Sequence, residues 1–244
     1  MAKKMIKRHT AVSIFIHWFN AVCWFFLLAT GVGLIRNSDL DPIGGWWPGM
    51  IRGIFGGGEN LLSAHVICGF IWIAVFLVFT VVRLRKEVRF FIREIFTFSP
   101  VNDIRWIIKK GIQMTMGYKM LERLGFEPKI PEQGFYNVGQ KLFAIPAMLG
   151  SIVIAATGII MYSSKFMMMD PVVVQWSVLV HFVMSGVVFA GLLIHIYMAS
   201  IATGELPALL SMFTGTVPEE YAEHHHKYWY DKINGNSKGC FNRR

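Results

Sequence analysis

Four histidines lie inside long apolar stretches of the sequence, where an ionisable side chain is costly and usually functional. They are His17, His65, His181 and His195. Imidazole is a good ligand for iron, zinc and copper, but these stretches contain no Asp or Glu and no cluster of cysteines beside the histidines that would complete a zinc site. The pattern therefore favours an iron porphyrin held by two axial imidazoles. No Cys-x-x-Cys-His sequence is present, which excludes covalent attachment of a c-type haem.

The spacing of the last two histidines supports this interpretation. His181 and His195 are 14 residues apart in one apolar stretch. At about 100° and ~1.5 Å per helical residue, they share one face of a helix and lie ~21 Å apart along its axis. Two ligands on one face, one toward each side of a membrane, are what two stacked haems require.

The apolar stretches that must position these histidines are each long enough to cross about 30 Å of hydrocarbon as a helix. Hydrophobic residues make up 54% of the 244 residues and charged residues only 16%, with a mean hydropathy of +0.47. This composition excludes a disordered protein and predicts an all-α integral membrane protein built as a four-helix bundle, with one membrane domain over residues 1–244. The predicted spans are residues 11–35, 61–82, 142–162 and 172–201.

The basic residues predict the orientation of the spans. Lys and Arg number four before the first span, two in the first loop, twelve in the second loop, one in the third loop and five in the tail. Because basic segments stay in the cytoplasm, both termini and the second loop are predicted to be cytoplasmic. The first loop, which contains Trp46, Trp47 and the glycines 56–58, is then predicted to lie on the outer side of the membrane. The net charge of +9 is explained without a nucleic-acid partner, and we expect the bacterial cytoplasmic (inner) membrane as the location.

The orientation sorts the four histidines by depth. His17 is near the start of the first span and His195 near the end of the fourth, so both lie toward the cytoplasm. His65 begins the second span and His181 lies in the outer half of the fourth. The depths therefore predict an outer haem between His65 and His181 and an inner haem between His17 and His195. The alternative for any one histidine is a hydrogen bond across helices or a position near the interface.

Two segments outside the spans are rich in aromatic side chains. In the second loop, apolar residues between Phe90 and Ile112 recur at helical spacing among Lys and Arg, which predicts amphipathic helices at the cytoplasmic interface. Docking of a partner subunit is an alternative role for them. Histidines 224–226 could bind a metal, but the aromatic residues 228–230 beside them favour a tail that packs on the membrane face or on a neighbour.

A polar segment directly precedes the third span at the cytoplasmic level. Its amides and glycine, Asn137, Gly139 and Gln140, are suitable partners for the carbonyls of a quinone, with His195 nearby. The alternative, which the residues alone favour, is an Asn-x-Gly turn that caps the following helix.

Together these residues resemble the cytochrome b (gamma) subunit of membrane-bound respiratory formate dehydrogenases, within the dihaem b-type cytochromes that include the hydrogenase b-type subunit. The likeness covers nearly the whole chain. It is carried by Ile16-His17-Trp18, His65, Tyr136-Asn137-x-Gly139-Gln140-Lys141, Leu179-Val180-His181, Leu193-Ile194-His195-Ile196-Tyr197-Met198-Ala199 and His225-His226-x-x-Trp229-Tyr230.

The resemblance implies two b-type haems, on His65 with His181 and on His17 with His195, and a menaquinone or other quinone at Asn137, Gly139 and Gln140. It also implies an iron–sulfur subunit and a molybdenum or tungsten catalytic subunit as partners, so that no formate chemistry occurs in this chain. One alternative is the b-type subunit of a periplasmic hydrogenase or related reductase. A second alternative, of another class, is a haem-free membrane anchor or proton-relay protein.

Overall fold

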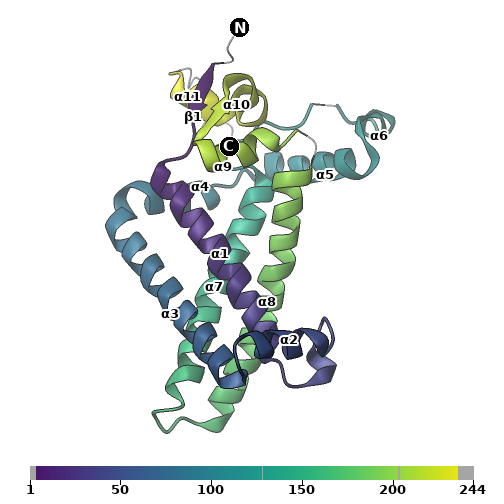
Figure 1. Ribbon diagram of the computed structural model, residues 1–244. Helices are drawn as coiled ribbons and strands as arrows, with labels where there is room; N and C mark the ends of the chain where they lie inside the picture. The colour runs from purple at the N-terminus through teal and green to yellow at the C-terminus, as the bar shows by residue number, and fades with distance from the viewer. Residues whose placement is uncertain (1–3, 128, 203, 236–244) are drawn as a thin grey trace. The chain divides into compact units, whose positions relative to one another are not determined.

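The computed structural model of the chain describes residues 4–127, 129–202 and 204–235 and is predominantly helical (Figure 1). It divides into two compact units, and each is described here by itself. The membrane unit comprises residues 11–84 and 148–190. The terminal unit comprises residues 1–10, 85–147 and 191–244. The single domain expected over residues 1–244 stays a prediction.

Four helices of the described residues are long and apolar enough to cross a membrane, which confirms the predicted all-α membrane architecture. The chain is thus a multi-pass membrane protein. The four apolar segments are Ala11–Leu34, Gly58–Ile95, Val138–Ser163 and Pro171–Ile201. Most of their side chains remain accessible, as expected for helices that face lipid.

The helix boundaries differ from the predicted spans where the chain is not apolar. The second segment continues past its apolar run, because α3 passes through a π-helical turn into α4, and the fourth segment likewise ends in a π-helical turn. Residues 46–54 of the first loop form a helix, which the prediction of a loop missed. The elements are α1 (Ala11–Leu34), α2 (Trp46–Ile54), α3 (Gly58–Arg83), α4 (Arg89–Ile95), α7 (Val138–Ser163) and α8 (Pro171–Ile196), with π-helical turns at Leu84–Val88 and Tyr197–Ile201.

In the membrane unit, small residues permit close helix contacts. A Cβ on Gly33 of α1 would lie 2.9 Å from Cγ2 of Ile51 in α2, and a Cβ on Gly150 of α7 would lie 2.6 Å from Cγ2 of Val188 in α8. Both separations are shorter than real Cβ contacts, so a side chain at either glycine would force its neighbour to move. Small residues at such contacts are typical of helix packing in membranes.

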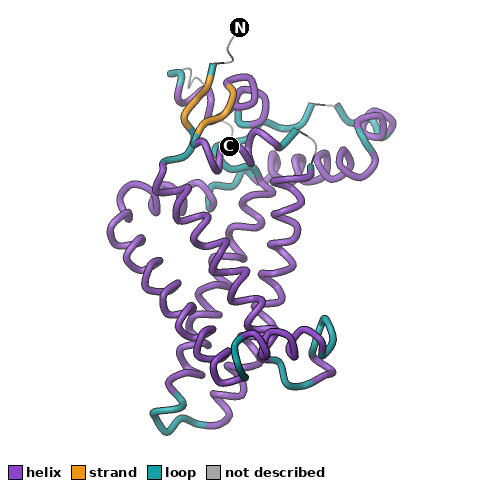
Figure 2. Tube along the Cα trace, in the orientation of Figure 1, coloured by secondary structure: helices purple, strands orange, loops and turns teal. Residues whose placement is uncertain are grey.

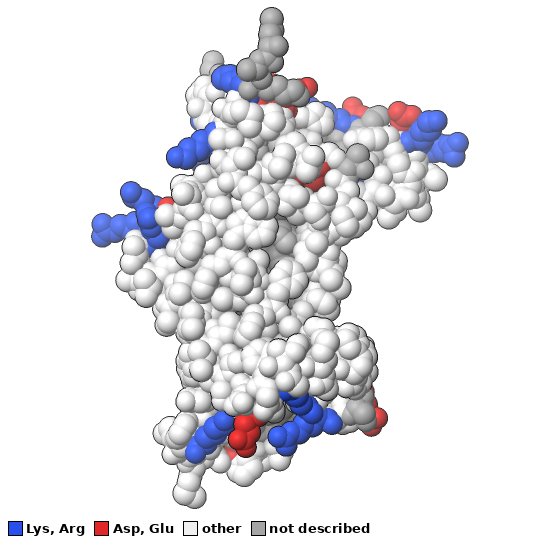
Figure 3. Space-filling model, viewed as in Figure 1, with Lys and Arg blue, Asp and Glu red and all other residues white. Residues whose placement is uncertain are grey.

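Polar side chains in the membrane unit pair across helices. Trp72 of α3 donates its indole N–H to Oδ1 of Asn20 in α1 at 2.8 Å. Figure 3 shows that the face over the middle of these helices carries no Lys, Arg, Asp or Glu, whereas charged side chains gather near α2. This distribution is the one that a hydrocarbon environment selects.

The terminal unit joins both ends of the described chain. The strand β1 (Met5–Lys7) pairs antiparallel with β2 (Thr216–Pro218), with Ile6 opposite Val217 (Figure 2). The segment before the first span and the segment after the fourth therefore lie together, which a helix-only prediction did not include. Besides α4, which ends the second apolar segment, the described helices of this unit outside the spans are α5 (Pro100–Met116), α6 (Tyr118–Arg123), α9 (Leu206–Thr214), α10 (Glu219–His225) and α11 (Lys227–Ile233).

The predicted amphipathic helices of the second loop are present as α4, α5 and α6. In α5, Asp103 and Trp106 are buried while Ile104, Ile107 and Ile108 are exposed. This leaves an apolar stripe beside a packed face, in agreement with an interfacial helix.

Candidate haem ligands and their surroundings

Two of the four predicted ligands lie together in the membrane unit. His65 in the first half of α3 and His181 in α8 have ring centroids 6.5 Å apart, with an interplanar angle of 63°. Both imidazoles are partly buried. The two helices thus bring together side chains 116 positions apart in the sequence. Their pairing around an outer haem stays a prediction.

The separation of the two rings suits an iron porphyrin. An iron atom bound at about 2 Å by one nitrogen of each ring would separate the centroids by roughly 6 Å, since each nitrogen lies about 1 Å from its ring centre. Glycines also flank the pair: a Cβ on Gly31 would lie 3.4 Å from Cε1 of His65, and a Cβ on Gly158 would lie 3.4 Å from Cε1 of His181. Because both positions are glycine, no side chain from them crowds the imidazoles. The residues therefore fit a haem with two histidine ligands.

Each imidazole of this pair also contacts a threonine. Nδ1 of His65 lies 2.9 Å from Oγ1 of Thr30 in α1, and Nδ1 of His181 lies 3.1 Å from Oγ1 of Thr157 in α7. The sequence analysis missed both threonines. A signal for them exists, because the tripeptide Ala-Thr-Gly occurs in the first and third spans at residues 29–31 and 156–158.

The other two predicted ligands belong to different units. His17 lies on α1 in the membrane unit, where its ring meets Trp18 edge-to-face at 5.4 Å. His195 lies near the end of α8 in the terminal unit, stacked on Phe143 of α7 with centroids 4.5 Å apart and planes 12° apart. Their pairing around an inner haem stays a prediction.

The polar segment before the third span forms the start of α7. Asn137 accepts a hydrogen bond from the backbone N–H of Gln140 at 2.9 Å, and the Gln140 side-chain oxygen accepts one from the backbone N–H of Asn137 at 3.0 Å. This reciprocal pair is a capping box, which agrees with the capping alternative. The capping box uses only the two side-chain oxygens, so it leaves the amide N–H groups, which are the donors that a quinone carbonyl needs.

The contacts of Gly139 and Lys141 show why the same segment contains a glycine and a lysine. A Cβ on Gly139 would lie 3.3 Å from Cη2 of Trp106 in α5. Lys141 is 7% exposed and donates to the carbonyl of Thr97 at 2.6 Å. The helix therefore begins four residues before the predicted span. Its first turn can include the charged Lys141 because the ammonium group is hydrogen-bonded to a backbone carbonyl.

The tail residues pack within the terminal unit. His226 is fully buried and donates Nδ1–H to the carbonyl of Gly134 at 2.8 Å, and Tyr228 accepts a hydrogen bond from Asn102 at 3.0 Å. Among the described residues, no group of three His, Cys, Asp or Glu side chains could hold a metal ion. These contacts hold the tail inside the terminal unit, whereas the sequence predicted packing on the membrane face or on a neighbour. Cys240 lies outside the described residues.

Buried ionisable groups of the terminal unit are paired with aromatic or polar neighbours. Arg8 is 8% exposed, donates to the carbonyl of Phe135 at 2.7 Å and lies over the rings of Phe135 and Trp229. Burial holds the pKa of His226 well below its usual value, and the Arg8 guanidinium lowers it further. His226 is therefore neutral.

A buried carboxylate lies in the same unit. Glu205 is 6% exposed and accepts a hydrogen bond from the Tyr221 hydroxyl at 2.9 Å. Lys110 and His225 approach it at 3.7 and 3.8 Å. Burial raises the pKa of the Tyr221 phenol, and the Glu205 charge raises it further.

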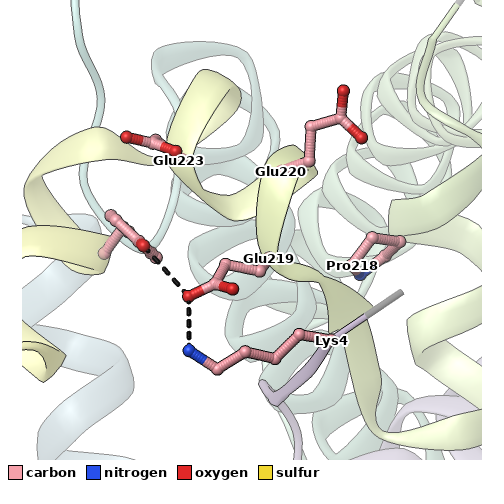
Figure 4. Close-up of a pocket in the computed structure, with 6 residues that line it drawn as sticks. Lys4, Pro218, Glu219, Glu220 and Glu223 are labelled. Atoms are coloured by element: carbon pink, nitrogen blue, oxygen red, sulfur yellow. Dashed lines mark hydrogen bonds and ion pairs between the residues drawn. The ribbon is translucent and has the colours of Figure 1, made fainter. Parts of the chain in front are cut away.

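At the surface of the terminal unit, an ion pair holds Lys4, the residue that precedes strand β1. Lys4 donates to Glu219 at 2.7 Å, and the Tyr230 hydroxyl donates to the same carboxylate at 3.0 Å, at the edge of a shallow pocket (Figure 4). The hydrogen bond from Lys4 holds the pKa of Glu219 below its usual value. Four of the six residues that line the pocket are charged.

Comparison with known families shows what class of protein these helices and histidines define. The profile of the family described as "Prokaryotic cytochrome b561" matches residues 8–215, which include all four long helices. The chain belongs to this family. Membership implies a b-type haem and a role in electron transport.

The chain is also similar, over nearly its whole length, to proteins named as cytochrome subunits of formate dehydrogenase. It is 28% identical over 232 residues to the "Formate dehydrogenase, nitrate-inducible, cytochrome b556(Fdn) subunit" of Escherichia coli strain K12, covering 94% of this chain and 92% of that one. It is 26% identical over 226 residues to the "Formate dehydrogenase, cytochrome b556 subunit" of Haemophilus influenzae, covering 92% and 82%. The resemblance to formate dehydrogenase cytochrome b subunits is thereby confirmed.

Proposed function

We propose that this chain is the dihaem cytochrome b membrane subunit of a formate dehydrogenase complex, which it anchors and from which it carries electrons to a quinone. The observation that carries the proposal is the 6.5 Å approach of His65 and His181 from two different helices of an apolar unit. The similarity to proteins named as formate dehydrogenase cytochrome subunits supports the partner.

In this proposal, the four histidines are the ligands of the two haems. A b-type haem supplies a reversible one-electron iron couple when bound. His65 and His181 hold the outer haem through their imidazoles, while His17 and His195 hold the inner haem. The 14-residue spacing on α8 directs two of these ligands to one face at two depths. The apolar helices keep water away from both sites, which favours electron transfer over side reactions of the iron.

The polar start of α7 has the second role. The amide N–H groups of Asn137 and Gln140 bind a quinone carbonyl, while their oxygens keep the helix cap. His195, stacked on Phe143 one turn further along α7, lies in the same unit. A quinone reduced there takes its protons from the cytoplasm, provided that the termini are cytoplasmic as the basic residues predict.

The partners and the membrane follow from the same proposal. An iron–sulfur subunit delivers electrons at the outer side, and a molybdenum or tungsten subunit oxidises formate. Reaction on opposite sides of the bacterial cytoplasmic (inner) membrane then moves charge across it.

The test uses the complex purified through a tag on this chain from its own host. Formate added without oxygen should reduce the haem α-band, and a quinone analogue should reoxidise it. Reduction by hydrogen and not by formate would assign the chain to a hydrogenase instead. A purified complex in which neither donor reduces haem would contradict the proposal.

A further inference from the structure

The two threonines beside the outer histidines each have three polar neighbours. Oγ1 of Thr30 lies 2.7 Å from the carbonyl of Phe26 and 2.9 Å from Nδ1 of His65. Oγ1 of Thr157 lies 2.8 Å from the carbonyl of Val153 and 3.1 Å from Nδ1 of His181. A second carbonyl lies at 3.2 Å from Thr30, on Leu27, and at 3.1 Å from Thr157, on Ile154.

All of these contacts can be hydrogen bonds at the same time in only one direction. A threonine hydroxyl has one proton, and a backbone carbonyl can only accept. The hydroxyl of Thr30 therefore donates to the carbonyl of Phe26, and its oxygen accepts from Nδ1–H of His65. The same count applies to Thr157 and His181.

The direction decides which nitrogen each imidazole offers to a ligand. With the proton on Nδ1, a neutral imidazole has its lone pair on Nε2. Metal-bound histidines commonly donate their other N–H to an acceptor, which fixes the tautomer and makes the ring a stronger base. Both histidines of the pair therefore carry the tautomer that an iron ligand needs.

The arrangement occurs twice with the same sequence. Ala29-Thr30-Gly31 on α1 faces His65, and Ala156-Thr157-Gly158 on α7 faces His181. In each case the threonine contacts Nδ1, and the glycine that follows it lies beside Cε1 without a side chain. Two helices thus present one short motif to one imidazole each.

We propose that Thr30 and Thr157 are positioning residues, which hold His65 and His181 with the proton on Nδ1 and Nε2 directed to the outer haem. The inference rests on the proposed function for the haem and on the threonine–imidazole distances for the tautomer. Because the hydrogen bond makes each imidazole a stronger base, it favours the oxidised iron and lowers the potential of the outer haem.

The experiment compares Thr30→Val and Thr157→Val with Thr30→Ser and Thr157→Ser in the full-length chain. Valine keeps the shape of threonine and removes the hydroxyl, whereas serine keeps the hydroxyl. Ser177→Ala is the matched control, since Ser177 of α8 is buried and donates to the carbonyl of Val173 in the same manner. We measure transfer of haem to apomyoglobin and the midpoint potential of each haem.

Each valine variant should lose the outer haem about 10- to 100-fold more readily, and the potential of that haem should rise. The serine variants and the Ser177→Ala control should match the wild type. Valine variants with wild-type retention and potential would overturn the inference. So would serine variants that behave like valine, because the methyl group would then be the important part.

A second measurement needs no haem. Nitrogen-15 NMR of histidine-labelled, haem-free chain should show one imidazole changing from the Nδ1–H to the Nε2–H tautomer or to a mixture in each valine variant. Nε2–H imidazoles for this pair in the wild type would overturn the inference. Failure of the proposed function has a different signature, which is a wild-type chain that binds no haem.

Discussion

The membrane unit and the terminal unit hold their buried histidines in different ways. In the membrane unit, His65 and His181 are held by threonine hydroxyls that are themselves bonded to helix carbonyls. In the terminal unit, His226 is held by the carbonyl of Gly134 beside the Arg8 guanidinium. The comparison shows that the membrane unit contacts its imidazoles through hydroxyl groups on neighbouring helices, whereas the terminal unit contacts its buried imidazole through a loop carbonyl beside a cation.

Removing one ligand of the outer pair is the strongest way to test this difference. His65→Ala or His181→Ala should lower haem from two to one per chain, and both should remove the same spectral component. Losing one of the two axial ligands removes half of the protein's bonds to the iron, so this site should hold its haem too weakly to keep it through purification. Pyridine haemochrome assays with low-temperature spectra make the measurement.

His224→Ala is the matched control, because His224 is exposed in the terminal unit. It should keep both haems. His17→Ala and His195→Ala should remove the other component. If His17→Ala and His65→Ala removed the same one, the pairing by depth would be wrong.

Two substitutions of Gln140 at the start of α7 distinguish its role in capping the helix from a role in binding quinone. Gln140→Glu keeps an oxygen for the cap but removes the amide N–H, so quinone reduction should fall about tenfold if one hydrogen bond to the quinone is lost. Gln140→Ala should lose the same activity and also about 1 kcal/mol of helix stability. Both variants should retain both haems. Steady-state reduction of a soluble quinone analogue measures the effect, and normal kinetics in Gln140→Glu would sink the assignment.

The buried carboxylate of the terminal unit offers a smaller test. Tyr221→Phe removes a hydrogen bond to the Glu205 carboxylate and should destabilise the unit by about 1.5–3 kcal/mol. Tyr228→Phe, which removes a bond between two neutral groups, should cost about 1 kcal/mol. Thermal midpoints in detergent compare the two. Equal losses would mean that the charge at Glu205 contributes nothing to the difference.

The smallest expected effect is a pH dependence from His226. Its pKa in the folded chain lies below the unfolded value of about 6.5, so the folded state binds fewer protons there. Stability is therefore present above pH 6.5 and lost as the pH falls toward the folded pKa, at up to about 1.4 kcal/mol per pH unit. His226→Asn, whose amide can donate to Gly134, should show a flatter pH profile than His224→Asn. A profile equal to that of His224→Asn would argue against a neutral buried His226.

Much of the membrane unit could be predicted because hydrocarbon imposes simple constraints. The four apolar runs follow from helix length and composition alone. The start of α7 was missed because the apolar run begins at Leu142, whereas the helix begins at a polar capping box. The helix at Trp46–Ile54 was missed because its Pro and Gly residues read as a loop.

The threonines and the terminal unit were harder to predict for a physical reason. Threonine is common in membrane helices, and only the repeated Ala-Thr-Gly distinguishes Thr30 and Thr157 from ordinary packing residues. The burial of Arg8 and His226 depends on β1 meeting β2, a contact between residues more than 200 positions apart. Local sequence carries no signal for such a contact.

The most direct test of the central claim is a reduced-minus-oxidised optical spectrum of the purified chain, with haem quantified per polypeptide by the pyridine method. We expect two b-type haems per chain. A colourless protein, produced with an adequate supply of haem, would contradict the assignment of the four histidines as haem ligands.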